Sequence, residues 1–227
     1  MAQTPLNVYG DVVVPTTGRH GADIASQRAD DLDLGCLDYV RKQIDVKKKL
    51  QVLDIGGGLG AQSFRVADLG AEVLMIDLSD REKNIEAYNV RAGRKAIRFL
   101  RQDVREIDTW PQDIGCVYSQ RMLNYLPYPD ALELLTTLSR CVLPGAFFFF
   151  SSGGIDTEYG RDYPDRDKPM EERFTFLTPA MAAKHTITSK VCLYREAELC
   201  ALAGRAGLTV DHAWTSPFGN PKVVAYK

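Results

Sequence analysis

The stretch VLDIGGGLGAQSFRVADLG, residues 52–70, restricts the possible fold of this chain more than any other feature of its sequence. A short apolar run typical of a buried strand leads into a cluster of glycines, and a segment with helical periodicity follows and ends at Gly70. Bare glycine backbone between a strand and a helix lets a ligand approach closely, and the first helical turn presents free N–H groups. The stretch therefore predicts a strand–turn–helix unit that binds a nucleotide-bearing ligand.

The same alternation of apolar runs and helical patterns continues along the chain. We expect strands over 50–56, 71–79, 96–104, 114–120, 145–154, 208–218 and 222–227, and helices over 31–46, 61–70, 81–93, 128–142 and 194–207. Short connections between alternating strands and helices predict a parallel sheet with helices on both faces. A turn at Gly219-Asn220-Pro221 separates the last two strands, which predicts a terminal hairpin.

Composition limits the classes of function. The chain has 227 residues, of which 45% are hydrophobic, and this is enough for one sizeable core. Its formal net charge of -2 gives no global electrostatic reason to bind nucleic acid or an anionic membrane, and we expect neither DNA nor a membrane as a partner. No apolar stretch approaches the roughly 18 to 20 residues of a membrane span, and we read no signal peptide in the first residues.

The cysteines give a hint about the compartment. The chain has 5 of them, scattered along the sequence, and none lies in a C-x-x-C pair. Because zinc sites need closely spaced ligands, we expect no metal site. An odd number of separate thiols is typical of a reduced protein, so we predict a cytoplasmic location.

Two classes of nucleotide-bearing cofactor fit the glycine cluster. Gly56, Gly58 and Ala61 match the G-x-G-x-x-A pattern of dinucleotide sites. Gly56, Gly58 and Gly60 equally match G-x-G-x-G, so glycine spacing alone does not choose between NAD and S-adenosylmethionine. Asp54 favours S-adenosylmethionine, because its carboxylate would repel a pyrophosphate but can help to hold an ammonium group, directly or through water.

At this point a family resemblance is clear. VLDIGGGLG resembles the first motif of the class I S-adenosylmethionine-dependent methyltransferases, and VLMIDLS, FLRQDVRE, VYSQRMLNYLPY and LPGAFFFFSS resemble the family's later motifs in order. The resemblance covers residues 49–152 and resumes weakly at 194–208 and in the last two strands. It implies an α/β, Rossmann-like methyltransferase fold with a seven-stranded, mostly parallel sheet, an antiparallel last strand and helices on both faces.

The resemblance also assigns a set of residues to the cofactor: Asp54, Gly56, Gly58, Gly60, Asp77, Leu78, Asp103, Val104, Ser119 and Gln120. In the family the acid of the second motif binds both ribose hydroxyls, which here is Asp77, and the next residue lies against the adenine. Asp103 and the Val104 backbone would meet the adenine amino group. Backbone carbonyls of Ser119 or Gln120 would contact the methionine moiety.

Residues for the acceptor are less specific. Methyl transfer is an in-line displacement in which the protein mainly positions and desolvates the nucleophile, so an obvious base is not required. His20, His185 and Tyr125 are our candidates for the catalytic role. Arg121, Asn124 and Tyr125 follow the fourth strand and are candidates for substrate binding, because ligands bind outside the carboxyl ends of the strands.

The irregular segments predict a cover over the acceptor. We expect a single domain over 1–227, in which residues 1–30 form an N-terminal lid or arm and residues 156–189 form an insertion that covers the acceptor site. Aromatic residues in these segments favour an aromatic-lined pocket, with a hydrophobic seam under the lid as the alternative; they are Tyr9, Tyr159, Tyr163, Phe174 and Phe176.

The acceptor itself is the least determined feature. The fourth motif lacks the N/D-P-P-Y/F sequence of the family's nucleobase- and glutamine-methylating branch. We predict nitrogen or oxygen methylation of a small molecule, with a protein or RNA acceptor, or a non-catalytic cofactor-binding protein, as alternatives. A basic cluster that would favour RNA is expected on the helix-covered side, away from the site: Arg91, Arg94, Lys95, Arg98 and Arg101. The oligomeric state is left open.

Overall fold

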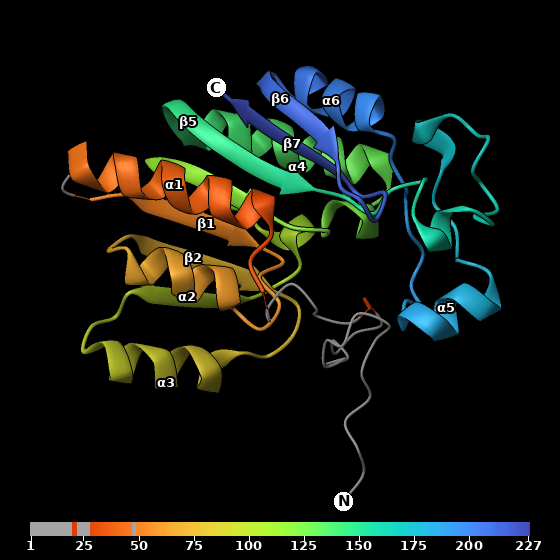
Figure 1. Cartoon of the computed structure of the whole chain (residues 1–227). Helices are drawn as coiled ribbons and strands as arrows, with labels where there is room; N and C mark the ends of the chain where they lie inside the picture. Colours follow the sequence, from red (N-terminus) through yellow and green to blue (C-terminus); the bar gives the residue numbers. More distant parts are fainter. Residues whose placement is uncertain (1–19, 22–27, 47–48) are drawn as a thin grey trace, which may run out of the picture.

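A computed structural model describes residues 20–21, 28–46 and 49–227 (Figure 1). The helices are α1 (Asp31–Val46), α2 (Ala61–Asp68), α3 (Glu82–Ala92), α4 (Tyr128–Cys141), α5 (Pro179–His185) and α6 (Glu196–Arg205). The strands are β1 (Gln51–Ile55), β2 (Glu72–Asp77), β3 (Ile97–Arg101), β4 (Ile114–Ser119), β5 (Val142–Ser151), β6 (Thr209–Thr215) and β7 (Pro221–Tyr226). Short 3-10 helices are η1 (Val104–Glu106), η2 (Leu123–Tyr125), η3 (Glu158–Gly160) and η4 (Met170–Glu172). Most of the predicted arm over 1–30 lies outside the described residues, and no helix among those described is long and apolar enough to cross a membrane.

The strands form one seven-stranded sheet with the order β3-β2-β1-β4-β5-β7-β6. Strands β1 to β5 pair in parallel, whereas β7 runs antiparallel to both β5 and β6. Successive side chains of a strand point to opposite faces of the sheet. In β1, Leu53 and Ile55 therefore belong to the buried cluster on one face, and Val52 belongs to the cluster on the other. The predicted fold class is confirmed.

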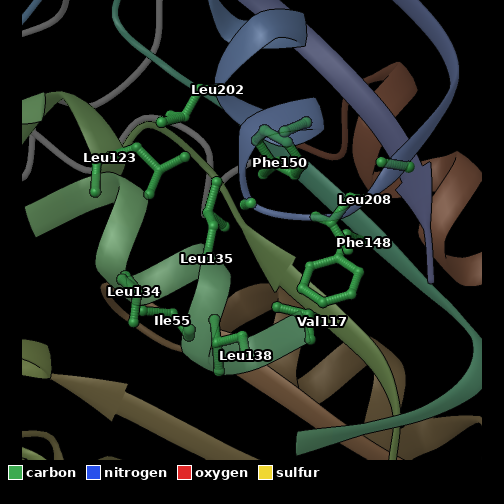
Figure 2. Packing of buried hydrophobic residues seen from close by; sticks show 14 of the residues in the cluster. Ile55, Val117, Leu123, Leu134, Leu135, Leu138, Phe148, Phe150, Leu202 and Leu208 are labelled. Atoms are coloured by element: carbon green, nitrogen blue, oxygen red, sulfur yellow. The ribbon is translucent and has the colours of Figure 1, made fainter. Parts of the chain in front are cut away.

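Helices cover both faces of this sheet. Figure 1 shows α1, α2 and α3 on one face and α4 and α6 on the other. On the second face Leu134 and Leu138 of α4 pack in one buried cluster with Val117 of β4 and Phe148 of β5 (Figure 2). Burial of such side chains on both faces is the main stabilising term of an α/β domain, at about 1.5 to 3 kcal/mol for each large apolar side chain.

Several segments differ from the sequence-based expectation: β5 spans Val142–Ser151 in place of 145–154, and β6 ends at Thr215 in place of 218. Strand β3 ends at Arg101 and does not reach 104, because the Asp103 carboxylate accepts the Arg105 backbone N–H and turns the chain into η1. The sequence predicts no regular element in residues 156–189, yet the structure has η3, η4 and α5 there. Pro179 stands at the start of α5, but a helix of 7 residues is too short to show a helical period.

Residues 152–195, which we call the accessory segment, leave the sheet after β5 and return at α6. Figure 1 shows this segment beyond the carboxyl ends of the parallel strands. It has a small apolar cluster of its own, formed by Ile155, Tyr163, Leu177, Ile187, Val191 and Leu193. Its base is joined to the turn between β6 and β7 at Gly154, where an added Cβ would lie 1.7 Å from the Gly219 carbonyl oxygen. Only a residue without a side chain permits this approach of two backbones.

Candidate functional site

Glycine backbone in the left-handed region forms the turn between β1 and α2. Gly56, Gly58 and Gly60 have φ angles of 70°, 56° and 86°, in the left-handed region that other residues rarely adopt. The Gly56 N–H donates to the Ile76 carbonyl at 2.8 Å, which ties the turn to β2. An added Cβ on Gly56 would lie 2.6 Å from Cγ of Met122, which follows β4. Two features therefore exclude a side chain from this turn: the positive φ angles of its glycines and the close contact of Gly56 with Met122.

Asp77, the last residue of β2, holds the same turn from the other side. Its Oδ2 accepts the Gly58 N–H at 2.9 Å, and its Oδ1 accepts the Ser79 N–H at 2.7 Å. An ionised carboxylate offers about four acceptor positions, so capacity is left for two further donors. Asp77 is therefore fixed in place and can still accept from a pair of hydroxyl groups.

Leu78 and Asp103 lie along the same edge of the sheet. Leu78 is 47% exposed and presents apolar surface there, while its carbonyl accepts from Arg101 Nε at 3.3 Å. The Asp103 carboxylate accepts from Arg105 Nη2 at 2.6 Å and from Arg105 Nε at 3.0 Å. This hydrogen-bonded guanidinium lowers the pKa of Asp103, so the carboxylate is ionised and can accept from an amino group. Val104 follows as the first residue of η1.

Asp54 lies beneath the glycine turn. Only 2% of its surface is exposed, and its Oδ2 accepts the Ser63 hydroxyl of α2 at 2.6 Å. An added Cβ on Gly57 would lie 3.1 Å from the same oxygen. Asp54 therefore supports the turn from below, and its contact with a cofactor ammonium stays a prediction.

Polar side chains after β4 hold neighbouring segments. Ser119 Oγ is buried and has no hydrogen-bond partner in the described part of the chain. Gln120 Nε2 donates to Asp30 Oδ2 at 2.7 Å, next to the start of α1. Asn124 is 3% exposed, and its Oδ1 accepts the Gly153 N–H at 2.9 Å. Asn124 thus joins β4 to the accessory segment, and its predicted contact with an acceptor stays a prediction.

His20 and Tyr125 are brought together beside the cofactor acids. The Tyr125 hydroxyl donates to the His20 carbonyl at 2.6 Å, and the two rings meet edge to face at 4.6 Å. His20 Nδ1 lies 3.2 Å from Ser189 Oγ. Burial lowers the pKa of His20, against the opposing charges of Asp77 and Asp103. The imidazole is therefore neutral at neutral pH.

His185 approaches from the accessory segment. Its Nε2 is buried without a hydrogen bond to any described residue, and it lies 3.4 Å from Glu158 Oε2. Its ring meets that of Tyr159 edge to face at 5.1 Å, and Lys184 pairs with the same Glu158. Burial lowers the pKa of His185 as well. The His185 carbonyl lies 3.6 Å from a Cβ added to Gly21, so the backbone at His185 runs next to the residue that follows His20.

The predicted aromatic lining is present only in part. Tyr159 adjoins this site, whereas Tyr163 donates its hydroxyl inside the accessory segment at 2.6 Å. Phe174 packs against the main core, and Phe176 is 53% exposed. Tyr9 lies outside the described residues. Tyr163 therefore fits the alternative prediction, a hydrophobic seam under the lid, better than the prediction of an aromatic pocket lining.

The basic cluster is split between two places. Arg94 Nη2 donates to the Ala67 carbonyl at 2.5 Å, away from the glycine turn. Arg101 instead ends β3 and reaches the Leu78 carbonyl at the edge where the acids lie. The prediction that this cluster avoids the site is wrong for Arg101, because the last residue of a parallel strand always lies at that edge. The described residues contain no group of histidine, cysteine and acidic side chains arranged to hold a metal ion.

Sequence reasoning missed two residues of the site. Arg105 could have been found, because an arginine two positions after an acid in a turn can fold back onto it. Met122 left no such signal, since its contact with Gly56 joins segments far apart in the sequence.

Comparison with known proteins agrees with this geometry. Residues 52–145 match the family model of a methyltransferase domain. The tRNA 5-carboxymethoxyuridine methyltransferase of Escherichia coli is 29% identical over 177 residues, which cover 73% of this chain and 65% of that protein. The ubiquinone biosynthesis O-methyltransferase of Dechloromonas aromatica is 28% identical over 117 residues, which cover 51% of this chain and 49% of that protein. The match thus spans less than two thirds of either relative.

A solved structure shows the same fold. The 1,6-didemethyltoxoflavin-N1-methyltransferase of Burkholderia thailandensis, with bound 1,6-didemethyltoxoflavin and S-adenosylhomocysteine, aligns with a TM-score of 0.62 at 16% identity. The alignment covers 88% of this chain and 79% of that one. At this low identity the likeness concerns the fold and not the substrate.

Proposed function

Since this chain belongs to the class I S-adenosylmethionine-dependent methyltransferase family, we propose that it transfers a methyl group from S-adenosylmethionine to a nitrogen or oxygen atom of a small molecule. One observation carries the proposal: an acid stands at the carboxyl end of each of three neighbouring strands, around a bare glycine turn. These acids are Asp54 of β1, Asp77 of β2 and Asp103, the second residue after β3.

The residues at this edge fit the cofactor. Asp77 retains acceptor capacity for the ribose hydroxyls, and exposed Leu78 offers apolar surface to an adenine. Asp103 would accept from the adenine amino group, and the turn at Gly56, which has no side chain, would let the methionine end approach the backbone. Carboxylates at the turn disfavour a pyrophosphate, so the geometry supports a sulfonium nucleoside over a dinucleotide.

The protein's own part in the chemistry is positioning and proton removal. When bound, the cofactor supplies a methyl group on a sulfonium that is already a good leaving group. His20, neutral because of its lowered pKa, can accept the proton that the acceptor nitrogen or oxygen loses. Burial raises the pKa of Tyr125, so its hydroxyl stays protonated and holds the His20 backbone in place. His185 is the second candidate for the base, since its pKa is also lowered by burial and its Nε2 contacts only the Glu158 carboxylate, at 3.4 Å, among the described residues.

A small acceptor is favoured by the accessory segment. This segment has its own apolar cluster and contacts the chain at His20 and Gly21 through Ser189 and the His185 carbonyl, which suits a compact acceptor enclosed by the accessory segment. The name of the Escherichia coli relative indicates tRNA as the substrate of that protein, so RNA is the second candidate. All 5 cysteines are unpaired in the structure, which supports a cytoplasmic location as part of this proposal.

Label transfer tests the acceptor class. The protein is incubated with methyl-labelled S-adenosylmethionine and a cell extract, which is then separated into small molecules, RNA and protein. We expect label in the small-molecule fraction. Label confined to RNA or protein would refute the small-molecule acceptor, and label in no fraction would favour the non-catalytic alternative.

Calorimetry tests the cofactor assignment. We expect S-adenosylmethionine and S-adenosylhomocysteine to bind and NAD not to bind. Asp77→Ala should weaken binding by at least about 1.5 kcal/mol, because charge-assisted hydrogen bonds are lost. Asp45→Ala, which removes an exposed acid at the far end of α1, serves as the matched control and should leave the affinity unchanged.

A further inference from the structure

Arg121 is held in a conformation that is unusual for its residue type. It follows β4 with a φ of 53°, in the left-handed region that favours glycine. Its backbone N–H donates to both the carbonyl and the hydroxyl oxygen of Ser151 at 3.1 Å, at the end of β5. A strained residue that neighbouring strands hold in place is often part of a functional site.

The Arg121 guanidinium differs from the other arginines at this edge of the sheet. Arg81 donates to the Gly58 carbonyl, Arg101 to the Leu78 carbonyl and Arg105 to the Asp103 carboxylate. No residue in the described ranges gives the Arg121 guanidinium a hydrogen bond or an ion pair, although its side chain is partly buried. A partly buried cation without a partner indicates that an anion is expected there.

Aromatic side chains lie near the backbone of Arg121. Tyr125 follows four residues later in the chain, and the Tyr159 hydroxyl lies 2.9 Å from a Cβ added to Gly153, just beyond the Ser151 that holds the Arg121 N–H. Each tyrosine ring is in edge-to-face contact with one of the two histidines. Burial raises the pKa of both hydroxyls, and the positive charge of Arg121 works in the opposite direction.

We propose that Arg121 binds a carboxylate on a small planar acceptor, with the Tyr125 and Tyr159 rings beside that acceptor and the reacting heteroatom directed toward the cofactor site. This inference rests on the proposed function and adds the chemical class of the substrate. A guanidinium presents a planar fork of donors that matches the two oxygens of a carboxylate.

The local charge balance favours a single negative charge on the ligand. Lys184 of the accessory segment is paired with Glu158, and Arg105 is paired with Asp103. Among the described residues, Arg121 therefore offers one positive charge without a protein partner. A phosphate carries nearly two negative charges and would need a second cation. Lys184 and Arg105 are each already paired with a carboxylate.

Binding of matched probes tests this proposal. The probes are benzoate, 4-hydroxybenzoate and 4-aminobenzoate, each compared with its neutral carboxamide, in titrations with and without S-adenosylhomocysteine. We expect at least one of the acids to bind, and its amide to bind at least about tenfold more weakly, because the charge-assisted pair is lost. Phenyl phosphate should bind no more tightly than benzoate.

Variants assign the effect to Arg121. Arg121→Gln should lower the affinity for the acid by at least about tenfold. The affinity of Arg121→Lys should lie between those of Arg121→Gln and the wild type, because lysine keeps the positive charge but lacks the paired donors of a guanidinium. Arg98→Gln, an exposed arginine on β3, is the matched control and should bind like the wild type. S-adenosylhomocysteine should bind all four proteins equally.

The outcomes separate the two proposals. If no acid binds, if acids and amides bind alike, if phenyl phosphate is preferred, or if Arg121→Gln binds the acid like the wild type, the carboxylate site is refuted. Failure of S-adenosylhomocysteine to bind the wild type would overturn the proposed function. The titrations of the acids and amides in the absence of S-adenosylhomocysteine would still test the Arg121 site.

Discussion

At the scale of single residues, Asp33 shows how a buried acid near the site can make stability depend on pH. Asp33 lies on the buried face of α1, 1% exposed, and its Oδ1 accepts the Tyr118 hydroxyl at 2.5 Å. Burial raises its pKa to about 6, although the Tyr118 hydrogen bond acts in the opposite direction. The folded state therefore binds a proton more tightly than the unfolded chain between roughly pH 4 and pH 6.

This raised pKa predicts a loss of stability with rising pH. The free energy of unfolding of the wild type, minus that of Asp33→Asn, should fall between pH 4 and pH 6 and stay level above that range. The fall should be on the order of 3 kcal/mol, which is about two pKa units. Urea denaturation at a series of pH values measures this difference, and a constant or rising difference would contradict the burial argument.

A second residue-scale prediction concerns Gly56 and Met122. Gly56→Ala should lower the affinity for S-adenosylhomocysteine at least about tenfold, since strain in the left-handed region costs about 1 kcal/mol or more and the new Cβ meets Met122 at 2.6 Å. Met122→Ala in the same chain removes the steric part and should restore some of the affinity. Calorimetry measures both. An unchanged affinity in Gly56→Ala would show that the turn is not in contact with the cofactor.

The residues found from the sequence share one property. Asp54, Asp77 and Asp103 each end or closely follow a strand with a clear apolar pattern, so their common edge of the sheet could be derived. The Arg105 pair and the Met122 contact could not be derived in the same way, because side-chain direction depends on the packing of the folded chain.

At the scale of elements, the accessory segment depends on its anchors. Arg173 is 3% exposed, and its guanidinium donates to both carboxylate oxygens of Glu198 on α6 at 2.6 and 2.8 Å. Arg195 also reaches Glu198, but its side chain is 41% exposed. The two arginines thus form a buried and an exposed pair with the same acid.

Replacement of these arginines should separate the two pairs. Arg173→Met should lower the free energy of unfolding by about 2 kcal/mol and speed proteolysis within residues 152–195, because a buried ion pair loses one partner. Arg195→Met should cost less than about 1 kcal/mol, as exposed pairs do. Thermal unfolding and limited proteolysis provide the measurements. Equal effects of the two changes would show that burial does not decide the strength of this anchor.

Regular elements were predictable where their pattern is long. Helix α1 begins and ends at Asp31 and Val46, as its periodicity predicts, and the sheet strands follow their apolar runs. Helix α5 and the short helices of the accessory segment were not predicted, because segments of 3 to 7 residues do not complete enough turns to show a helical period.

At the scale of the whole molecule, the sheet order explains where the site lies. The chain moves from β1 to the edge strand β3 and then returns to the other side of β1 at β4, so the order reverses between β1 and β4. Ligands of open α/β sheets bind outside the carboxyl ends of the strands at such a reversal. The glycine turn, the acids and Arg121 all lie at this edge, and the accessory segment stands beyond it (Figure 1).

The sequence motifs could reveal this edge but not the acceptor. The motifs belong to the part of the chain that binds the cofactor, whereas His185, Tyr159 and the anchors of the accessory segment come from a region without a motif. Their relation to His20 depends on tertiary packing alone.

The most direct test of the account is a crystal structure of the protein with S-adenosylhomocysteine. We expect the ribose hydroxyls within hydrogen-bond distance of Asp77, the adenine against Leu78 and the methionine end over the turn at Gly56. A nucleoside bound elsewhere, or the same crystals taking up NAD at this turn in its place, would contradict the central claim.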